Sequence, residues 1–180
     1  MINRLSELSH LEQVYYHAGD VISSHRLKRE DEIPQHGSVT CYEHSVAVTL
    51  MSVRLAHGLR MKKLDMESMI KGALLHDYFL YDWRSDDNDI SRREHGFHHA
   101  ARALENAGRD FSLTPVARDV IRHHMFPLNI RPPKYKESYI VSFADKVIAT
   151  KEVCRFVKNK MKNGASRSVN FVRNRRVTNI

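Results

Sequence analysis

Cysteine is scarce in this chain: Cys41 and Cys154 are the only two, and neither belongs to a Cys-x-x-Cys pattern. A disulfide framework and a thiolate zinc site are therefore both disfavoured, and two free thiols are expected. No apolar run approaches the ~18 residues that would cross a bilayer. The first residues also lack the basic segment, apolar block and small-residue cleavage site of a signal peptide. We therefore expect a cytoplasmic protein with no membrane partner.

Acidic residues are missing from the C-terminal end. From Arg155 onward the chain has eight Lys and Arg residues and no Asp or Glu, so the other 21 basic residues balance the 21 acidic ones and the net charge of +8 belongs to this tail. A basic tail can attract RNA, an acidic partner or a phosphorylated substrate. A solvated helix end with a frayed terminus has the same composition. RNA binding has less support, because the tail lacks the aromatic interleaving on which bases would stack.

The chain also has few β-favouring alternations, no internal repeats and no low-complexity segment. Its 180 residues are enough for one compact domain with a sizeable core. We predict an all-α fold, a single-domain helical bundle. Its main domain covers residues 35–158. The preceding segment, residues 1–34, packs an N-terminal helix on the core. Residues 159–180 form the basic tail, which is not a separate domain.

Helix boundaries are signalled by capping patterns. Thr40-x-x-Glu43 and Ser91-x-x-Glu94 have capping-box form, Ser6 and Asp65 are candidate N-caps, Thr114-Pro115 places Pro at a first helical position, and glycines at 19 and 108 are expected stops. Residues 30–39, with Pro34 and Gly37, are predicted to be a loop. The predicted helices cover residues 6–19, 41–57, 65–77, 91–107, 116–125 and 137–162.

Several of these helices carry histidine or aspartate on an apolar stripe. His44 shares a helical face with Val48 and Met51, whereas Ser45, Thr49 and Ser52 are expected on other faces. His95 and His99 share a face, and His98 is turned away from it toward the surface. Each histidine alone could be a core residue bonded to a carbonyl, but an aspartate on such a stripe is costly to bury unpaired. The candidate set in chain order is His44, His76, Asp77, His99, His123, His124 and Asp145.

Metal binding accounts for the whole set. Imidazole and carboxylate ligands without thiolate suit divalent Fe, Mn, Zn, Ni or Co, and inner helix faces of a bundle are common places for such sites. Seven ligands exceed what one ion uses, so we predict two ions. Such a pair lowers the pKa of a bound water and stabilises both the attacking and the leaving oxygen in phosphoester displacement.

The order of these residues resembles the signature of the HD-domain superfamily of metal-dependent phosphohydrolases, and in particular small stand-alone bacterial members. The strings around Gln35-His36-Gly37, His76-Asp77, His95-Gly96-Phe97-x-His99 and Ala144-Asp145-Lys146 are similar to theirs, over about residues 35–155. The resemblance implies the HD-type helical bundle, a buried divalent metal centre and phosphoester hydrolysis, often of nucleotides. It makes His44, His76, Asp77 and Asp145 the basic metal set, with Asp77 as the bridge, and His99, His123 and His124 the ligands of a second ion.

Leu80 stands where the branch that cleaves a cyclic dinucleotide has a lysine, and no GYP motif is present, so that substrate is unsupported. Asp77 and His76 are our predicted catalytic residues, acting through a metal-activated hydroxide. The expected partner is a small phosphorylated substrate such as a nucleotide, and an oligomer is left open. Alternative functions are a non-catalytic metal- or nucleotide-binding sensor on the same fold, or an RNA-binding protein acting through the tail. Predicted substrate contacts, all near ligand-bearing segments, are Lys146, His36, Arg84 and His95.

Overall fold

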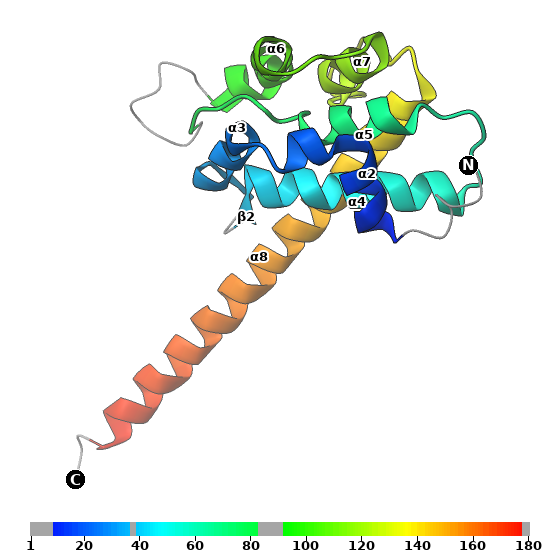
Figure 1. The fold of residues 1–180 in the computed structure, drawn as a ribbon. Helices are drawn as coiled ribbons and strands as arrows, with labels where there is room; N and C mark the ends of the chain where they lie inside the picture. The colour runs from blue at the N-terminus through cyan, green and yellow to red at the C-terminus, as the bar shows by residue number, and fades with distance from the viewer. Residues whose placement is uncertain (1–8, 37–38, 83–91, 178–180) are drawn as a thin grey trace.

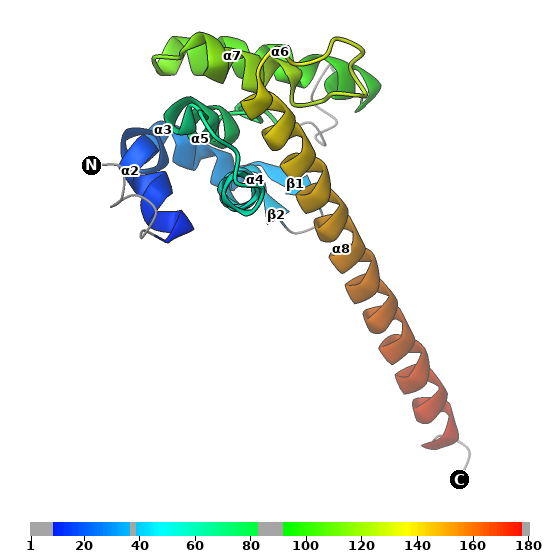
Figure 2. The same cartoon turned by 90° about the vertical axis from the view of Figure 1, so that its right-hand side faces the viewer.

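The computed structural model describes residues 9–36, 39–82 and 92–177, with the backbone alone for His36 and for residues 92–97 and 162–177. Within these residues a two-stranded hairpin is the only sheet, so the predicted all-α fold is confirmed. The elements are α2 (His10–Ile22), α3 (His25–Lys28), η1 (Arg29–Glu32), β1 (Pro34–His36), β2 (Val39–Thr40), α4 (Cys41–Gly58), α5 (Met66–Leu74), α6 (Arg92–Asp110), α7 (Pro115–His123) and α8 (Lys136–Val177). Figure 1 shows α6 and α7 at the top of the view, above α4 and α5, and Figure 2 shows α2 on one side of α4 and α8 on the other.

Helix α4 begins where its sequence signal predicts. Thr40 and Glu43 form the capping box, each side chain accepting a hydrogen bond from the other residue's backbone N–H. The helix packs against α5 and α8, and its buried face differs from the predicted one, because it includes Ser45, Thr49 and Ser52. The hydroxyls of Thr49 and Ser52 donate to backbone carbonyls four residues earlier, which removes the cost of burying them. Small polar residues thus serve as packing positions here.

Helices α5 and α7 approach each other closely at Gly72. A β-carbon at this position would lie 2.7 Å from Cβ of Val120, so only glycine fits without displacement. The same pair of helices is joined at their N-termini, where the hydroxyls of Ser68 and Thr114 are 2.7 Å apart. Thr114 caps α7, and Pro115 follows it, as predicted. This contact fixes the ends of both helices relative to one another.

Helix α8 is much longer than predicted. Its first turns pack against α4 and α7 and bury Val141 and Ala144 in the core, whereas its later part extends away from the other helices in both views (Figures 1 and 2). The helix ends at Val177 rather than near Lys162, so the basic tail continues the helical backbone. None of the described helices combines the length and the apolar character that crossing a membrane requires.

Other boundaries also differ from the prediction. Helix α2 begins with a capping box of Ser9 and Glu12 and runs past Gly19 to Ile22, with a kink at Ala18. Helix α6 likewise passes Gly108 and ends at Asp110. Glycine permits a helix end but does not force one. The predicted caps Ser6 and Ser91 lie outside the described residues, and the predicted loop at 30–39 contains most of η1 and the hairpin.

Candidate metal centre

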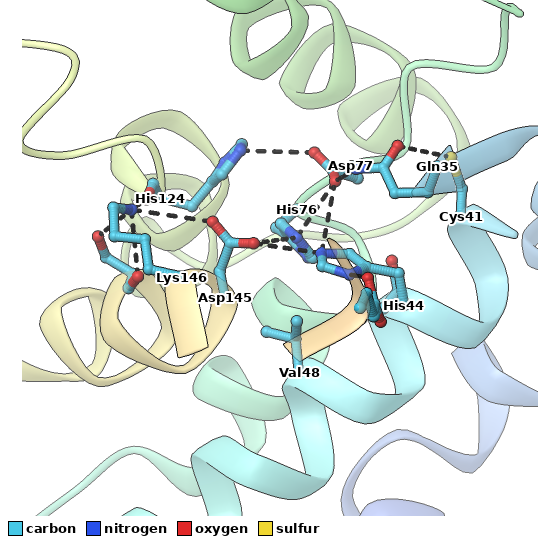
Figure 3. Close-up of polar contacts among 12 residues, drawn as sticks. Gln35, Cys41, His44, Val48, His76, Asp77, His124, Asp145 and Lys146 are labelled. Carbon is cyan, nitrogen blue, oxygen red and sulfur yellow. Dashed lines mark hydrogen bonds and ion pairs between the residues drawn. The ribbon is translucent and has the colours of Figure 1, made fainter. Parts of the chain in front are cut away.

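Six of the seven predicted ligands meet at the centre of the bundle. Figure 3 labels all of them except His99. They form two groups in which the possible ligand atoms lie within 4.8 Å of one another, and every member is buried. Helices α4, α6 and α8 supply one residue each, and the segments that follow α5 and α7 supply the others. We call His44, His76 and Asp145 the first group, and Asp77, His99 and His124 the second group.

The adjacent pair His76 and Asp77 does not lie on a helix, contrary to the prediction. Helix α5 ends at Leu74, and the next three residues form a turn. On a helix, consecutive side chains diverge by about 100°, whereas the turn directs both toward the same centre. Asn106 of α6 holds the segment by donating to the carbonyls of Tyr78 and Phe79, at 3.2 and 2.9 Å.

Asp77 lies between the two groups. Its Oδ2 atom is 3.4 Å from Nε2 of His76 and 3.9 Å from Nε2 of His44. Its Oδ1 atom is 3.4 Å from Nε2 of both His99 and His124. One carboxylate oxygen therefore faces each set of imidazoles. The side-chain amide of Gln35 donates to Oδ2, which fixes the orientation of the carboxylate.

Hydrogen bonds at Nδ1 fix the tautomers of three histidines. Nδ1 of His76 is 2.8 Å from the carbonyl oxygen of Ala73, and Nδ1 of His124 is 2.7 Å from that of Ile121. Since a carbonyl oxygen only accepts, both Nδ1 atoms carry the hydrogen. Nδ1 of His44 donates in the same way to the carboxylate of Glu152, at 2.9 Å. When these rings are neutral, their Nε2 atoms present lone pairs, the arrangement typical of metal-binding histidines.

Two of these Nε2 atoms lie close to atoms that can themselves accept a hydrogen bond. Nε2 of His44 lies 3.2 Å from Oδ1 of Asp145, and Nε2 of His99 lies 2.9 Å from Nε2 of His124. Nε2 of His76 and Oδ1 of Asp77 are buried without a hydrogen-bond partner among the described residues. Buried acceptors that converge in this way repel one another unless a proton or cation lies between them. The nitrogen and oxygen donors fit divalent transition metals.

Comparison with protein families decides the affiliation of the chain. Residues 41–150 match the HD domain, and this range contains all six clustered residues. The chain belongs to the HD-domain family. Its members are generally metal-dependent phosphohydrolases, which agrees with the donor set. The chain matches no curated protein and no solved structure.

The pKa shifts in this HD domain show how strongly its ionisable groups interact before a metal binds. Burial lowers the pKa of His44, but hydrogen bonds with Asp145 and Glu152 outweigh burial and raise it to about 10. Burial raises the pKa of Asp145, but the bond with His44 and the nearby His76 lower it to about 2. Burial, together with repulsion from His76, lowers the pKa of His124 to about 3. In the metal-free protein His44 and Asp145 of the first group therefore share a proton, whereas His124 is neutral.

His123 is not brought into either group. Its Nδ1 atom lies 2.8 Å from Oδ1 of Asp119, one helical turn earlier on α7. The other carboxylate oxygen of Asp119 accepts from the backbone N–H groups of Lys134 and Tyr135 and from the hydroxyl of Ser138. The two adjacent histidines point in different directions at the end of α7, so only His124 faces the centre.

The predicted substrate contacts have different positions. Lys146 donates to the carbonyl oxygens of His124 and Ser142 and to the Ser142 hydroxyl, at 2.7, 3.1 and 3.1 Å. An ammonium group has three hydrogens, so this arrangement favours a role in positioning the end of α7 over contact with substrate. His36 ends β1 and His95 lies on α6, but both side chains, like all of Arg84, lie outside the described residues. His98 is exposed, as expected.

Two polar residues behind the ligands were not predicted. The carboxylate of Glu152 accepts a hydrogen bond from Nδ1 of His44. The sequence offered one indication of this, because Glu152 shares a helical stripe with Asp145 and Ile148. Glu30 is fully buried, and its two carboxyl oxygens have no hydrogen-bond partner among the described residues. Burial, followed by repulsion from Asp77, places the pKa of Glu30 well above its ordinary value. Burial and this repulsion both favour the neutral form of the Glu30 carboxyl group.

Proposed function

We propose that this protein is a two-metal phosphohydrolase that cleaves a phosphoester of a small phosphorylated metabolite, with nucleotides as the favoured class. The observation that carries the proposal is the position of Asp77, whose Oδ2 faces the first group and whose Oδ1 faces the second. A carboxylate in this position is suited to bridge two ions. The first ion would be held by the first group with Asp77, and the second ion by the second group.

Two divalent ions, when bound, lower the pKa of a water and stabilise the attacking and leaving oxygens of an in-line displacement at phosphorus. The chain's own contribution is orientation. Glu152 and Gln35 fix the ring of His44 and the carboxylate of Asp77, and carbonyl oxygens fix His76 and His124. Such partners keep ligands in place before substrate arrives. Because Asp77 and His76 are buried, bulk water is largely excluded from the reacting centre.

The metal is expected to be Fe, Mn, Zn, Ni or Co, because imidazole and carboxylate donors without thiolate suit these ions. The organic group of the substrate can be identified by measuring hydrolysis of a panel of phosphoesters. The panel should include nucleoside mono-, di- and triphosphates, sugar phosphates and a general aryl phosphate. Each substrate should be tested with each metal after removal of bound ions by a chelator.

The decisive comparison is between wild type and Asp77→Asn. This substitution preserves the size of the side chain but weakens binding to both ions, so turnover should fall by about three orders of magnitude or more, with loss of metal. His25→Ala is a suitable control, because His25 is exposed on α3, outside the two groups. Undiminished turnover in folded Asp77→Asn would contradict the proposal. A wild-type protein that binds two ions but hydrolyses no phosphoester would instead be a sensor on this fold.

A further inference from the structure

A second concentration of polar side chains lies on the outer side of α7 and is not explained by the metal centre. Here a cavity of about 700 Å³ is bounded by α7 and by the loop that precedes α8. Four cationic side chains line it: Arg118 and Arg122 from α7, and Arg131 and Lys134 from the loop. All four are exposed, so their charged groups are accessible to a ligand.

The positive charge of this cavity is not neutralised by the protein. Within the described part of the chain, none of the four cations forms an ion pair. Asp119 is the one acidic residue in the lining, and it is buried. Its oxygens already bind His123, Ser138 and the backbone of the loop. Four uncompensated cations in one concave surface favour an anion with several charges.

A neighbouring cavity of about 510 Å³ shares Arg122, His123 and Arg131 with the first. We call the two cavities together the groove. Its remaining walls are largely apolar, with Ala101 from α6 and the side chains of Leu128 and Ile130 from the loop. Ile130 is 90% exposed, which is unusual for so large an apolar side chain and gives a ligand apolar surface to cover. The groove therefore has one cationic section and one apolar section.

We propose that this groove binds an organic oligophosphate, a molecule in which two or three linked phosphates carry an apolar or aromatic group, as nucleoside polyphosphates do. The phosphates would lie among Arg118, Arg122, Arg131 and Lys134, since guanidinium groups bind phosphate oxygens in pairs. The organic group would lie against Leu128 and Ile130. Both cavities have the size of pockets that hold small ligands. An RNA strand is less suited, because among the lining residues Tyr135 is the one aromatic side chain other than histidine.

This groove is separate from the metal centre, although α7 connects them. His124 faces the centre, whereas Arg118, Arg122 and His123 line the groove. Asp119 joins α7 to the loop through the backbone N–H groups of Lys134 and Tyr135. Binding in the groove therefore does not require the ligands of the metal centre.

The test is calorimetric binding of ATP and of inorganic triphosphate to the full chain in excess chelator, so that neither metal nor hydrolysis contributes. Wild type should bind both, and ATP more tightly because it can cover the apolar section. Arg122→Ala/Arg131→Ala should weaken binding of both probes by about tenfold or more, since each arginine supplies charge-assisted hydrogen bonds. Arg54→Ala, which removes an exposed arginine of α4 outside both cavities, should leave binding unchanged.

Asp77→Asn separates this proposal from the proposed hydrolase. Binding in chelator should persist in that variant even when its turnover is lost, and it should persist in wild type if no phosphoester is ever hydrolysed. Equal affinity of wild type and folded Arg122→Ala/Arg131→Ala would overturn the groove proposal. So would loss of binding in Asp77→Asn alone, which would place the phosphates at the metal centre. Arginine-dependent binding of single-stranded RNA without binding of ATP would assign the groove to nucleic acid instead.

Discussion

Gly72 of α5 lies so close to Val120 of α7 that a β-carbon on Gly72 would come within 2.7 Å of Cβ and 2.8 Å of Cγ1 of Val120. His76 and Asp77 are the second and third residues after α5, and His124 directly follows α7. The separation of the two metal groups therefore depends on how closely these helices approach. A glycine without any polar function thereby contributes to the geometry of the centre.

Gly72→Ala should destabilise the protein. Alanine is favoured over glycine in a helix by about 1 kcal/mol, but forcing a methyl group into a filled contact costs about 1–3 kcal/mol. We expect the free energy of unfolding to fall by about 1 kcal/mol in metal-free protein, together with weaker binding of metal. Gly19→Ala is the matched control, because no atom lies within 4 Å of the added group. Chemical denaturation would measure both, and Gly19→Ala should be neutral or stabilising.

Glu152 offers a test of the residues behind the ligands. Its carboxylate accepts the Nδ1 hydrogen of His44, so Glu152→Ala should leave that ring free to rotate and change tautomer. Loss of such a partner costs about 10- to 100-fold in metal affinity. Glu152→Gln keeps an oxygen acceptor and should lose much less. Competition titration against a chromophoric chelator would measure the affinities. Equal losses in the two variants would indicate that charge, rather than orientation, is the contribution of Glu152.

The fold was largely predictable from local signals. The Thr40 capping box, the Asp65 cap and the Thr114-Pro115 pair each start a helix where the sequence predicts one. The signals for helix ends were less informative, because Gly19 and Gly108 lie inside helices whose continuation depends on packing. The burial of Thr49 and Ser52 on α4 was missed for a similar reason, since the carbonyl partners of their hydroxyls appear only once the helix is formed.

The composition of the centre was predictable, but its geometry was not. Histidine and aspartate on predicted helices identified the whole candidate set, His76 and Asp77 included, and the family resemblance divided that set between two ions. Helical periodicity could not reveal that His76 and Asp77 lie in a turn. Nor could it decide between two adjacent histidines at a helix end, where Asp119 holds His123 away from the centre. These choices depend on contacts between distant segments.

The two adjacent histidines should therefore differ in their effect on metal content. We expect wild type to bind two equivalents of a divalent transition metal and His124→Ala to lose one, because His124 belongs to the second group. His123→Ala should keep two equivalents while losing some thermal stability, since it removes the bond to Asp119. Elemental analysis of proteins purified without oxygen would measure the stoichiometry. Loss of one ion from folded His123→Ala, with none from His124→Ala, would reverse the assignment.

The metal-free protein should be most stable near the ordinary histidine pKa of 6.5, and two buried histidines should produce opposite limbs of the pH profile. The folded-state pKa of His124 is lowered to about 3. Between pH 6.5 and 3 the unfolded chain therefore binds a proton at His124 that the folded chain does not, and stability falls on acidification. The pKa of His44 is raised to about 10, so its contribution is complete below pH 6.5 and is lost as pH rises toward 10.

Thermal unfolding in excess chelator, measured at about one-unit steps from about pH 4 to about pH 10, would test this profile. His124→Asn should flatten the acid limb, because asparagine can still donate to the carbonyl of Ile121 but does not titrate. Glu152→Gln should flatten the alkaline limb, because the loss of a carboxylate brings the pKa of His44 back toward its ordinary value. Saturation with metal should abolish the alkaline limb in wild type, since a ligating His44 holds no proton on Nε2. A metal-free profile that rises steadily with pH would show that His44 and Asp145 do not share a proton in the folded protein.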